Sequence, residues 1–574
     1  MNKAKATPPK KSKKGKRKKL TPEDIAKNLY RKDVRDIFLK SGFRRVPGIS
    51  DREFFFRNKF KSDFDDVFIY KNIIIFNEYT LTKSSNISDH LKPKKIIYDT
   101  VLENKDEFLE YLLEKFPTLK DEIESVYKLS DLRIVILYCS KNDVDPTYKD
   151  IVPDIKFFDY PVLRYFKVVT DAVKLSAKFE MFKFLGLENK DVGENVFKNR
   201  IFKTDIKGTI LPESHSNFKK GFKVVSFYID PETLLTHSYV LRKQGWRDDD
   251  EVYQRMIMTK KIIAIRRHLL KEERVFINNI IVTLPPETKI KDEDGNTVDT
   301  KNLQSTQPVI VEIPDAYNVI GLIDGQHRVF AYHEGGERDE EVKILRKKQN
   351  LLVTGIIYPR NILDTDKIKF EAKLFLEINS NQSNAKSDLK QSISLILNPF
   401  AGDSIAKSLI NRLNFTGPLA NKFEKHFYEN DKIKTTSVVS YGLRPIIKLS
   451  GTDSFYHIWS NPNKSDLIDK KDELLLKKYV EFAASELNIF FSAFRISIAE
   501  NRWTSNPKDP NKTLSTTIIN GLIICFRKLI EENKIGDLAY YQKKFTGVDK
   551  FNFKEYKSSQ YGSLARKLFD QFFA

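Results

Sequence analysis

A strand-to-helix junction at residues 319–336 constrains the fold of this chain more than any other segment. It reads Val-Ile-Gly-Leu-Ile-Asp-Gly-Gln-His-Arg-Val-Phe-Ala-Tyr-His-Glu-Gly-Gly, so an apolar run ends at Asp324 and polar residues follow. Gly325 permits a tight turn, because glycine tolerates backbone angles that other residues avoid. The first amides of a helix that begins here have no partner within the helix and can hold an anion. The pattern therefore predicts an α/β unit with a phosphate-binding turn.

The polar residues of this junction have chemically distinct expected roles. Arg328 and the first helical amides would hold a phosphate together, with Gly325 and Gln326 at the turn. His327 would act as an acid or base, or orient a ligand. Asp324 would hold a metal ion or a ribose hydroxyl. The same residues also allow a purely structural interpretation, in which Asp324 caps the helix and Arg328 forms a surface ion pair.

The charge of the chain favours a polyanionic partner. Its 574 residues suggest about two to four domains, and the formal net charge is +21 at pH 7. Ten of the positive charges lie in residues 1–20, which contain no acid, and the remainder of the chain is still basic. The simplest polyanion is nucleic acid, and DNA is the expected partner. The alternative is a protein whose lysine-rich faces only keep it in solution.

Cysteine content and hydropathy exclude several classes of protein. The two cysteines, Cys139 and Cys525, are far apart and flanked by apolar residues, so neither a disulfide framework nor a cysteine-based zinc site is expected. The longest apolar runs are too short to cross a bilayer. No apolar segment follows the basic N-terminus, as a secretory signal would require. A cytoplasmic protein without membrane contact is the expectation.

The order of expected strands and helices predicts an α/β multidomain protein. A basic arm at its start would touch DNA phosphates without sequence preference, or would serve as a solubilising tail or targeting signal. Alternating strands and helices follow in two regions, separated by a helical bridge, and the remainder is mostly helical. The expected divisions are a disordered arm at 1–20, an α/β domain at 21–155, a bridge at 156–215, a second α/β domain at 216–400 and a helical domain at 401–574.

The five residues Asp324-Gly325-Gln326-His327-Arg328 match the motif of the DGQHR-domain family, which includes DndB-like proteins of DNA-modification systems. The segment also resembles the ParB/sulfiredoxin superfamily, in which a Gly-x-x-Arg segment, here Gly325 to Arg328, lines a nucleotide phosphate site. The resemblance covers residues 220–400 and implies a ParB-like domain that binds a nucleoside triphosphate. Sulfiredoxins have a cysteine at the position of Gln326, so sulfinic acid reduction is not expected.

A second segment extends the resemblance downstream of the motif. Residues 375–382 read Phe-Leu-Glu-Ile-Asn-Ser-Asn-Gln and resemble the Asn/Gln element of the same family. The resemblance adds Asn379, Asn381 and Gln382 to the expected nucleotide site. The Arg of the corresponding ParB box is missing near Asn381, which is a departure from the family pattern.

A basic helix is expected at 251–271, shortly before the motif. Its positive residues would face the phosphates of a bound nucleic acid, or would form an ordinary solvated helix face. The expected DNA-binding residues are Arg255, Lys260, Lys261, Arg266 and Arg267.

Acidic residues flank an expected β-hairpin near the start of the chain. Two apolar runs at 67–70 and 73–76 are split by Lys71-Asn72, with Asp66 before the first run and Glu78 after the second. An Asp and a Glu that converge at the ends of adjacent strands can hold Mg²⁺ for phosphodiester hydrolysis. The alternative is a hairpin whose acids only cap its strands.

This hairpin resembles the core of PD-(D/E)XK nucleases. The resemblance implies that Asp66 and Glu78 bind the metal, with Glu53 as a further acid. The family pattern places a lysine two residues after the Glu, whereas this chain has Glu78-Tyr79-Thr80, so Lys83 is the candidate for that role.

These features lead to three alternative functions. The first is a bacterial DNA-modification or anti-phage protein in which a Mg²⁺-dependent nuclease domain is coupled to a DGQHR domain that senses nucleotide or modified DNA. The second is a non-catalytic DndB-like regulator or adaptor that binds DNA and other proteins of a modification or defence operon. The third is a switch that hydrolyses nucleoside triphosphates. A homo-oligomer is compatible with each.

Overall fold

The computed structural model of the chain divides into two units, Met1–Asn199 and Arg200–Ala574. The structure describes residues 21–50, 52–57, 60–82, 86–123, 125–198, 202–240, 257–379, 387–425, 429, 432–506, 509 and 511–574. The basic arm expected at 1–20 lies outside these residues.

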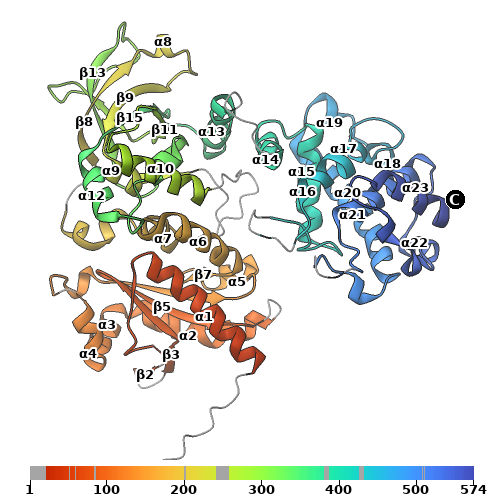
Figure 1. Ribbon diagram of the computed structural model, residues 1–574, viewed down its shortest axis with the longest axis horizontal. Coiled ribbons are helices and arrows are strands. Elements are labelled where there is room, and N and C mark those ends of the chain that lie inside the picture. The colour runs from red at the N-terminus through yellow and green to blue at the C-terminus, as the bar shows by residue number, and fades with distance from the viewer. Residues whose placement is uncertain are drawn as a thin grey trace, which may run out of the picture. The chain divides into compact units, whose positions relative to one another are not determined.

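The first unit is built on a mixed five-stranded sheet in the order β1-β4-β5-β6-β7 (Figure 1). β4 pairs with β5 as an antiparallel hairpin, whereas β5, β6 and β7 are parallel to one another. β2 and β3 form a separate antiparallel hairpin. The strands are β1 (Arg44–Arg45), β2 (Arg52–Phe56), β3 (Phe60–Phe64), β4 (Asp66–Tyr70), β5 (Ile73–Thr80), β6 (Arg133–Ser140) and β7 (Lys156–Phe158).

Helices cover both faces of this sheet. α1 (Pro22–Lys40) begins at a capping box formed by Thr21 and Asp24, and its Phe38 stacks on Phe68 of β4 at 4.8 Å between ring centroids. On the opposite face, α2 (Ile87–Glu103) and α3 (Lys105–Lys115) contribute to a buried core that includes Val67 and Phe76. The expected α/β domain is therefore present, with its sheet between two helical layers.

The expected bridge at 156–215 is divided between the two units. Its helices α6 (Tyr160–Val173) and α7 (Lys178–Leu185) lie in the first unit, where α6 packs against α1. Its last part forms β8 (Phe202–Leu211), which pairs with β9 and β13 of the second unit. The amphipathic pattern identified the helices, but it did not indicate which sheet they cover.

The second unit contains an eight-stranded mixed sheet that curls into a half-barrel, in the order β10-β14-β11-β15-β9-β8-β13-β12 (Figure 1). The motif strand β14 lies near one edge, parallel to β10 and antiparallel to β11. Besides β8, the strands are β9 (Lys223–Ile229), β10 (Ser238–Tyr239), β11 (Ile280–Leu284), β12 (Lys289–Lys291), β13 (Gln307–Pro314), β14 (Ile320–Asp324) and β15 (Leu351–Ile357).

Short helices surround the motif strand. α11 (Gln326–Phe330) follows it directly and packs against α9 (Pro231–His237) and α10 (Thr259–Glu272). α12 (Asp339–Lys348) also contacts α9, and α13 (Asp364–Asn379) packs against β14 through a small core that includes Ile323 and Phe375. α14 (Ser387–Leu397) packs against α13 and against the first long helix of the helical region.

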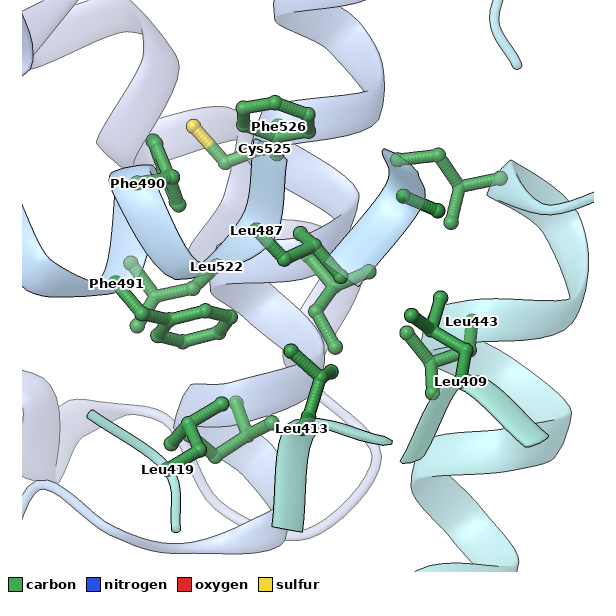
Figure 2. Close-up of a cluster of buried hydrophobic side chains, with 14 of the residues drawn as sticks. Leu409, Leu413, Leu419, Leu443, Leu487, Phe490, Phe491, Leu522, Cys525 and Phe526 are labelled. Carbon is green, nitrogen blue, oxygen red and sulfur yellow. The ribbon is translucent and has the colours of Figure 1, made fainter. Parts of the chain in front are cut away.

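The C-terminal part of the chain is largely helical and has its own large core. Its main helices are α15 (Gly402–Phe415), α20 (Glu473–Ile496), α21 (Thr516–Glu531), α22 (Leu538–Lys544) and α23 (Tyr561–Phe572). Figure 2 shows leucine and phenylalanine side chains of α15, α20 and α21 meeting in this core, together with Cys525. No helix among the described residues is both long and apolar enough to span a membrane.

Candidate functional site

The motif forms a sharp turn that only glycine can make. Gly325 has a φ of +94°, and a Cβ atom at this position would lie 2.5 Å from Cδ1 of Ile280. The amides of Arg328 and Val329 donate hydrogen bonds to the Gly325 carbonyl at 2.9 and 3.0 Å, which starts α11. The tight turn expected at this glycine is confirmed, and β11 packs directly against it.

Arg328 turns back onto the end of the strand. Its Nη2 donates hydrogen bonds to Oδ2 of Asp324 and to the carbonyl oxygen of Asn279, both at 2.9 Å. The two charged side chains are only 19% and 24% exposed, so this ion pair is partly shielded from water. Asp324 therefore neutralises Arg328 and does not cap the helix, whose N-cap residue is Gly325.

His327 connects the motif with the basic helix. The backbone amide of Met258, the N-cap residue of α10, donates a long hydrogen bond of 3.4 Å to Nε2 of His327. This contact requires Nε2 to accept, which assigns the imidazole proton to Nδ1 in the neutral ring. Gln326 is 3% exposed and lies inside the fold. The N-terminal end of α10 therefore lies against the motif.

The predicted DNA-binding residues of α10 separate into two groups. Lys260, Lys261 and Arg267 are exposed, and Arg267 pairs with Glu337 at 3.0 Å. Arg266 is 1% exposed and faces the interior, so it does not belong to the exposed cationic face. Arg255 lies outside the described residues. The helix begins at Thr259, later than expected.

Arg266 instead holds the loop that follows α11. Its guanidinium donates to the carbonyl oxygens of Ala331, His333 and Glu337 at 3.0, 2.7 and 2.8 Å. Its Nη2 also contacts Oδ1 of Asp339 at 3.1 Å. A buried guanidinium with four such partners fixes the loop because each lost contact would leave a buried polar group unpaired.

A second buried arginine completes this arrangement. Arg346 of α12 donates to the carbonyl of Tyr332 at 2.7 Å and to Oδ1 of Asp339 at 2.9 Å. Burial raises the pKa of Asp339, but the Gly335 amide and the arginines Arg346 and Arg266 outweigh burial and hold this pKa below its ordinary value. The carboxylate therefore stays ionised between the two guanidinium groups.

The downstream Asn/Gln element is only partly described. The side-chain amide of Asn379 donates to the carbonyl of Phe375 at 2.9 Å, a contact within the last turn of α13. Asn381 and Gln382 lie outside the described residues. The role expected for these three residues in a nucleotide site stays a prediction.

Glu371 of α13 is a buried acid beside the motif strand β14. It was not among the residues singled out from the sequence. Oε1 of Glu371 accepts hydrogen bonds from the hydroxyls of Tyr239, Thr283 and Tyr358 at 2.8, 2.7 and 2.6 Å. Burial raises the pKa of Glu371, although the three hydroxyls oppose this effect. A Cβ on Gly321 of β14 would lie 2.9 Å from this Oε1. Glu371 thus fastens α13 to β10, to β11 and to the residue that follows β15.

The acids of the predicted nuclease site lie in different environments. Asp66 is fully buried and receives hydrogen bonds from Arg35, at 2.6 and 3.1 Å, and from Nε of Arg45. Glu78 is 6% exposed and its Oε2 lies 2.9 Å from Nζ of Lys94 on α2. Each carboxylate is thus balanced by basic side chains.

The two acids also project from opposite faces of the sheet. Asp66 pairs with Asn77 across the hairpin, and adjacent residues of a strand point to opposite faces. Asp66 accordingly meets Arg35 of α1, whereas Glu78 meets Lys94 of α2. The structure therefore does not bring Asp66 and Glu78 together at a shared metal position.

The remaining nuclease candidates do not complete such a site. Glu53 lies in the separate β2–β3 hairpin, opposite Asp63, and Lys83 falls outside the described residues. Within the part of the chain that the structure describes, no three His, Cys, Asp or Glu side chains converge as metal ligands. The residues present therefore do not fit the Mg²⁺ site expected from Asp66 and Glu78.

Sequence reasoning did not predict the cluster that does form around Glu78. Its neighbour on β6, Tyr138, contacts Nδ1 of His90 at 2.9 Å, and His90 lies one helical turn before Lys94. Burial and the nearby Lys94 and Lys27 lower the pKa of His90, so the imidazole is neutral near pH 7. The i,i+4 spacing of His90 and Lys94 was the available signal.

Comparisons of the chain with models of protein families, with curated proteins and with solved structures find no match. The resemblance of residues 324–328 to the DGQHR motif therefore stays a prediction.

Proposed function

We propose that this chain is a non-catalytic DNA-binding protein that contacts duplex DNA through the surface formed by α10 and the motif turn. The likeness of residues 324–328 to DndB-like proteins supports a role as regulator or adaptor in a bacterial DNA-modification or defence system. A ParB-like half-barrel would then serve as a recognition scaffold, and the other proteins of that system would be its partners.

The contact between the α10 N-terminus and His327 carries this proposal. Because Met258 donates to His327 at 3.4 Å, the exposed Lys260 and Lys261 of the first turn lie beside the motif. Arg267, two turns further along the helix, is exposed but paired with Glu337, so the proposed phosphate contacts are those of Lys260 and Lys261. Such cations hold DNA mainly through its phosphates, so the proposed contact positions the protein without reading a sequence.

The geometry gives less support to a Mg²⁺-dependent nuclease or a nucleotide hydrolase. Asp66 and Glu78 face opposite sides of their sheet, and basic side chains hold both. Arg328, the expected phosphate ligand of a nucleotide, is bonded to Asp324. Asp66 and Glu78 therefore share no position for a metal ion, and Arg328 would have to leave Asp324 before it could bind a nucleotide phosphate.

The proposal is tested with the full chain and a fluorescent duplex, by anisotropy at several salt concentrations. Replacing Lys260 and Lys261 by Glu should weaken binding about tenfold or more and flatten the salt dependence, since two phosphate contacts are removed. The matched control replaces Lys477 and Lys478, which are exposed on α20, by Glu. Equal affinities of the two double variants would overturn the proposed surface.

A further inference from the structure

A cavity of about 390 Å³ opens in the C-terminal helical region between α15 and α20. Its walls include Arg412 of α15, the loop 416–418, and Ser485, Asn488 and Ser492 along one side of α20. This volume lies in the range of small-ligand pockets. The lining combines a larger apolar surface with hydroxyl, amide and guanidinium groups, so it suits an occupant that has planar apolar parts and polar edges.

The loop at the cavity wall is fitted closely to α20. Gly417 has a φ of +91°, and a Cβ there would lie 2.2 Å from Oδ1 of Asn488. Trp503 donates from Nε1 to the Pro418 carbonyl at 3.2 Å. These contacts hold the loop in place, so the cavity wall that the loop forms has a fixed position.

An aromatic side chain stands exposed beside the cavity. Phe415, the last residue of α15, is 65% exposed, although the core of this region takes up most other phenylalanines. The guanidinium carbon of Arg412 lies 5.9 Å from its ring centroid. An exposed ring next to a cation is the arrangement on which nucleic-acid bases stack.

Three further cations gather next to this wall. Lys422 and Lys432 are neighbours because the Ile433 amide donates to the Lys422 carbonyl at 2.9 Å. Arg495 lies one turn beyond Ser492 on α20. Burial lowers the pKa of Lys422, and the positive charges of Lys432 and Arg495 lower it further. Across the described ranges, none of the three cations, nor Arg412, forms an ion pair with an acidic side chain.

We propose that this cavity, Phe415 and the adjacent cations form a binding site for single-stranded nucleic acid. One base stacks on Phe415 and a neighbouring base enters the cavity, while phosphates run past Arg412 toward Lys422, Lys432 and Arg495. Glu481, an exposed acid at the cavity wall, repels phosphates and so favours this direction of the backbone. The site is separate from the duplex-binding surface of α10 and does not depend on it.

The test measures anisotropy of labelled oligothymidine and oligouridine with the full chain. Wild type should bind, and Phe415→Ala and Arg412→Gln should each weaken binding about tenfold through lost stacking and a lost phosphate contact. Arg495→Glu should reduce the salt dependence. All three replaced residues are exposed, so the variants should keep the wild-type circular dichroism and melting temperature.

Leu474→Ala is the matched control, because Leu474 is 70% exposed on the same helix α20 but is not part of the cavity lining. It should bind as wild type does. No binding of either oligonucleotide by wild type, or equal affinities of Phe415→Ala, Arg412→Gln and Leu474→Ala, would overturn the proposal. A preference for one oligonucleotide identifies the strand as DNA or RNA.

Two variants distinguish failure of the single-strand site from failure of the duplex-binding surface of α10. The Lys260→Glu, Lys261→Glu variant should lose duplex binding and keep single-strand binding, whereas Phe415→Ala should do the reverse. If each variant lost affinity for both the duplex and the single strand, the two sites would not be separate.

Discussion

Arg328 and Asp324 are bonded across one turn, with Nη2 and Oδ2 2.9 Å apart at the junction of β14 and α11. The pair holds the only arginine of the motif against the strand end, where it also contacts the Asn279 carbonyl. An anion that approaches this turn must compete with the Asp324 carboxylate for the guanidinium. Asp324 therefore keeps Arg328 folded back against the strand end.

Removing the charge of Asp324 should strengthen DNA binding. In Asp324→Asn the guanidinium of Arg328 loses its ionic partner and can engage a phosphate, so the slope of log affinity against log salt should steepen by about 0.9. Anisotropy with a labelled duplex measures this slope. Arg328→Ala in the same background should return it to the wild-type value, and an unchanged slope in Asp324→Asn would show that Arg328 does not face the duplex.

Gly325→Ala should destabilise the second unit more than an ordinary turn substitution does. The positive φ costs about 1–2 kcal/mol in any left-handed position, and the overlap with Ile280 adds about 1–3 kcal/mol. Gly295→Ala is the control, because Gly295 has a φ of +85° with no atom near its would-be Cβ. Urea unfolding of both variants separates the two costs, and equal losses would mean that β11 yields to the extra methyl group.

Arg266→Lys should cost far more stability than Arg267→Lys. A lysine cannot reproduce the four contacts of Arg266, and breaking a buried ion pair costs about 3–5 kcal/mol. Arg267 is exposed, so its replacement should change stability by about 0.5 kcal/mol or less. Thermal unfolding of the two variants measures the difference. Similar melting temperatures would show that Arg266 does not hold the loop 331–339.

Local patterns in the sequence predicted the parts of the fold that depend on local chemistry. The turn at Gly325 and the strand that ends at Asp324 follow from glycine and from the apolar run before it. The half-barrel order depends on pairings between distant strands, such as β11 with β15, and no single segment encodes such a pairing.

The candidate sites show the same limit at the level of side chains. Arg266 and Arg267 are adjacent in sequence and equally basic, yet one is buried and the other exposed, because α10 turns only one side toward α11. Glu371 was not predicted because its three hydroxyl partners come from segments up to 132 residues away. Asp66 and Glu78 were expected together because hairpin ends are close, but strand alternation separates their side chains.

Glu371 should make the stability of the second unit depend on pH. Burial raises its folded-state pKa above the ordinary value of 4.5. Its stabilising contribution is therefore complete below the pKa of the unfolded chain and declines as pH rises through the folded-state pKa. As pH rises from acid to neutral, the melting temperature of wild type should thus fall relative to that of Glu371→Gln, whose side chain cannot ionise. Glu377→Gln, an exposed change on the same helix, should follow wild type, and parallel curves for all three proteins would contradict this assignment.

Asp66 and Glu78 should prove to be structural acids. Replacing Asp66 by Ala leaves Arg35 and Arg45 without their buried partner, which should cost about 1–3 kcal/mol and lower the melting temperature of the first unit. Glu78→Ala should act similarly, because it removes the carboxylate that lies 2.9 Å from Nζ of Lys94. Plasmid DNA incubated with Mg²⁺ should show the same integrity with wild type and with the Asp66→Ala, Glu78→Ala double variant. Nicking by wild type that the double variant lacks at a temperature where both remain folded would restore the nuclease hypothesis, because lost stability alone could not then explain the difference.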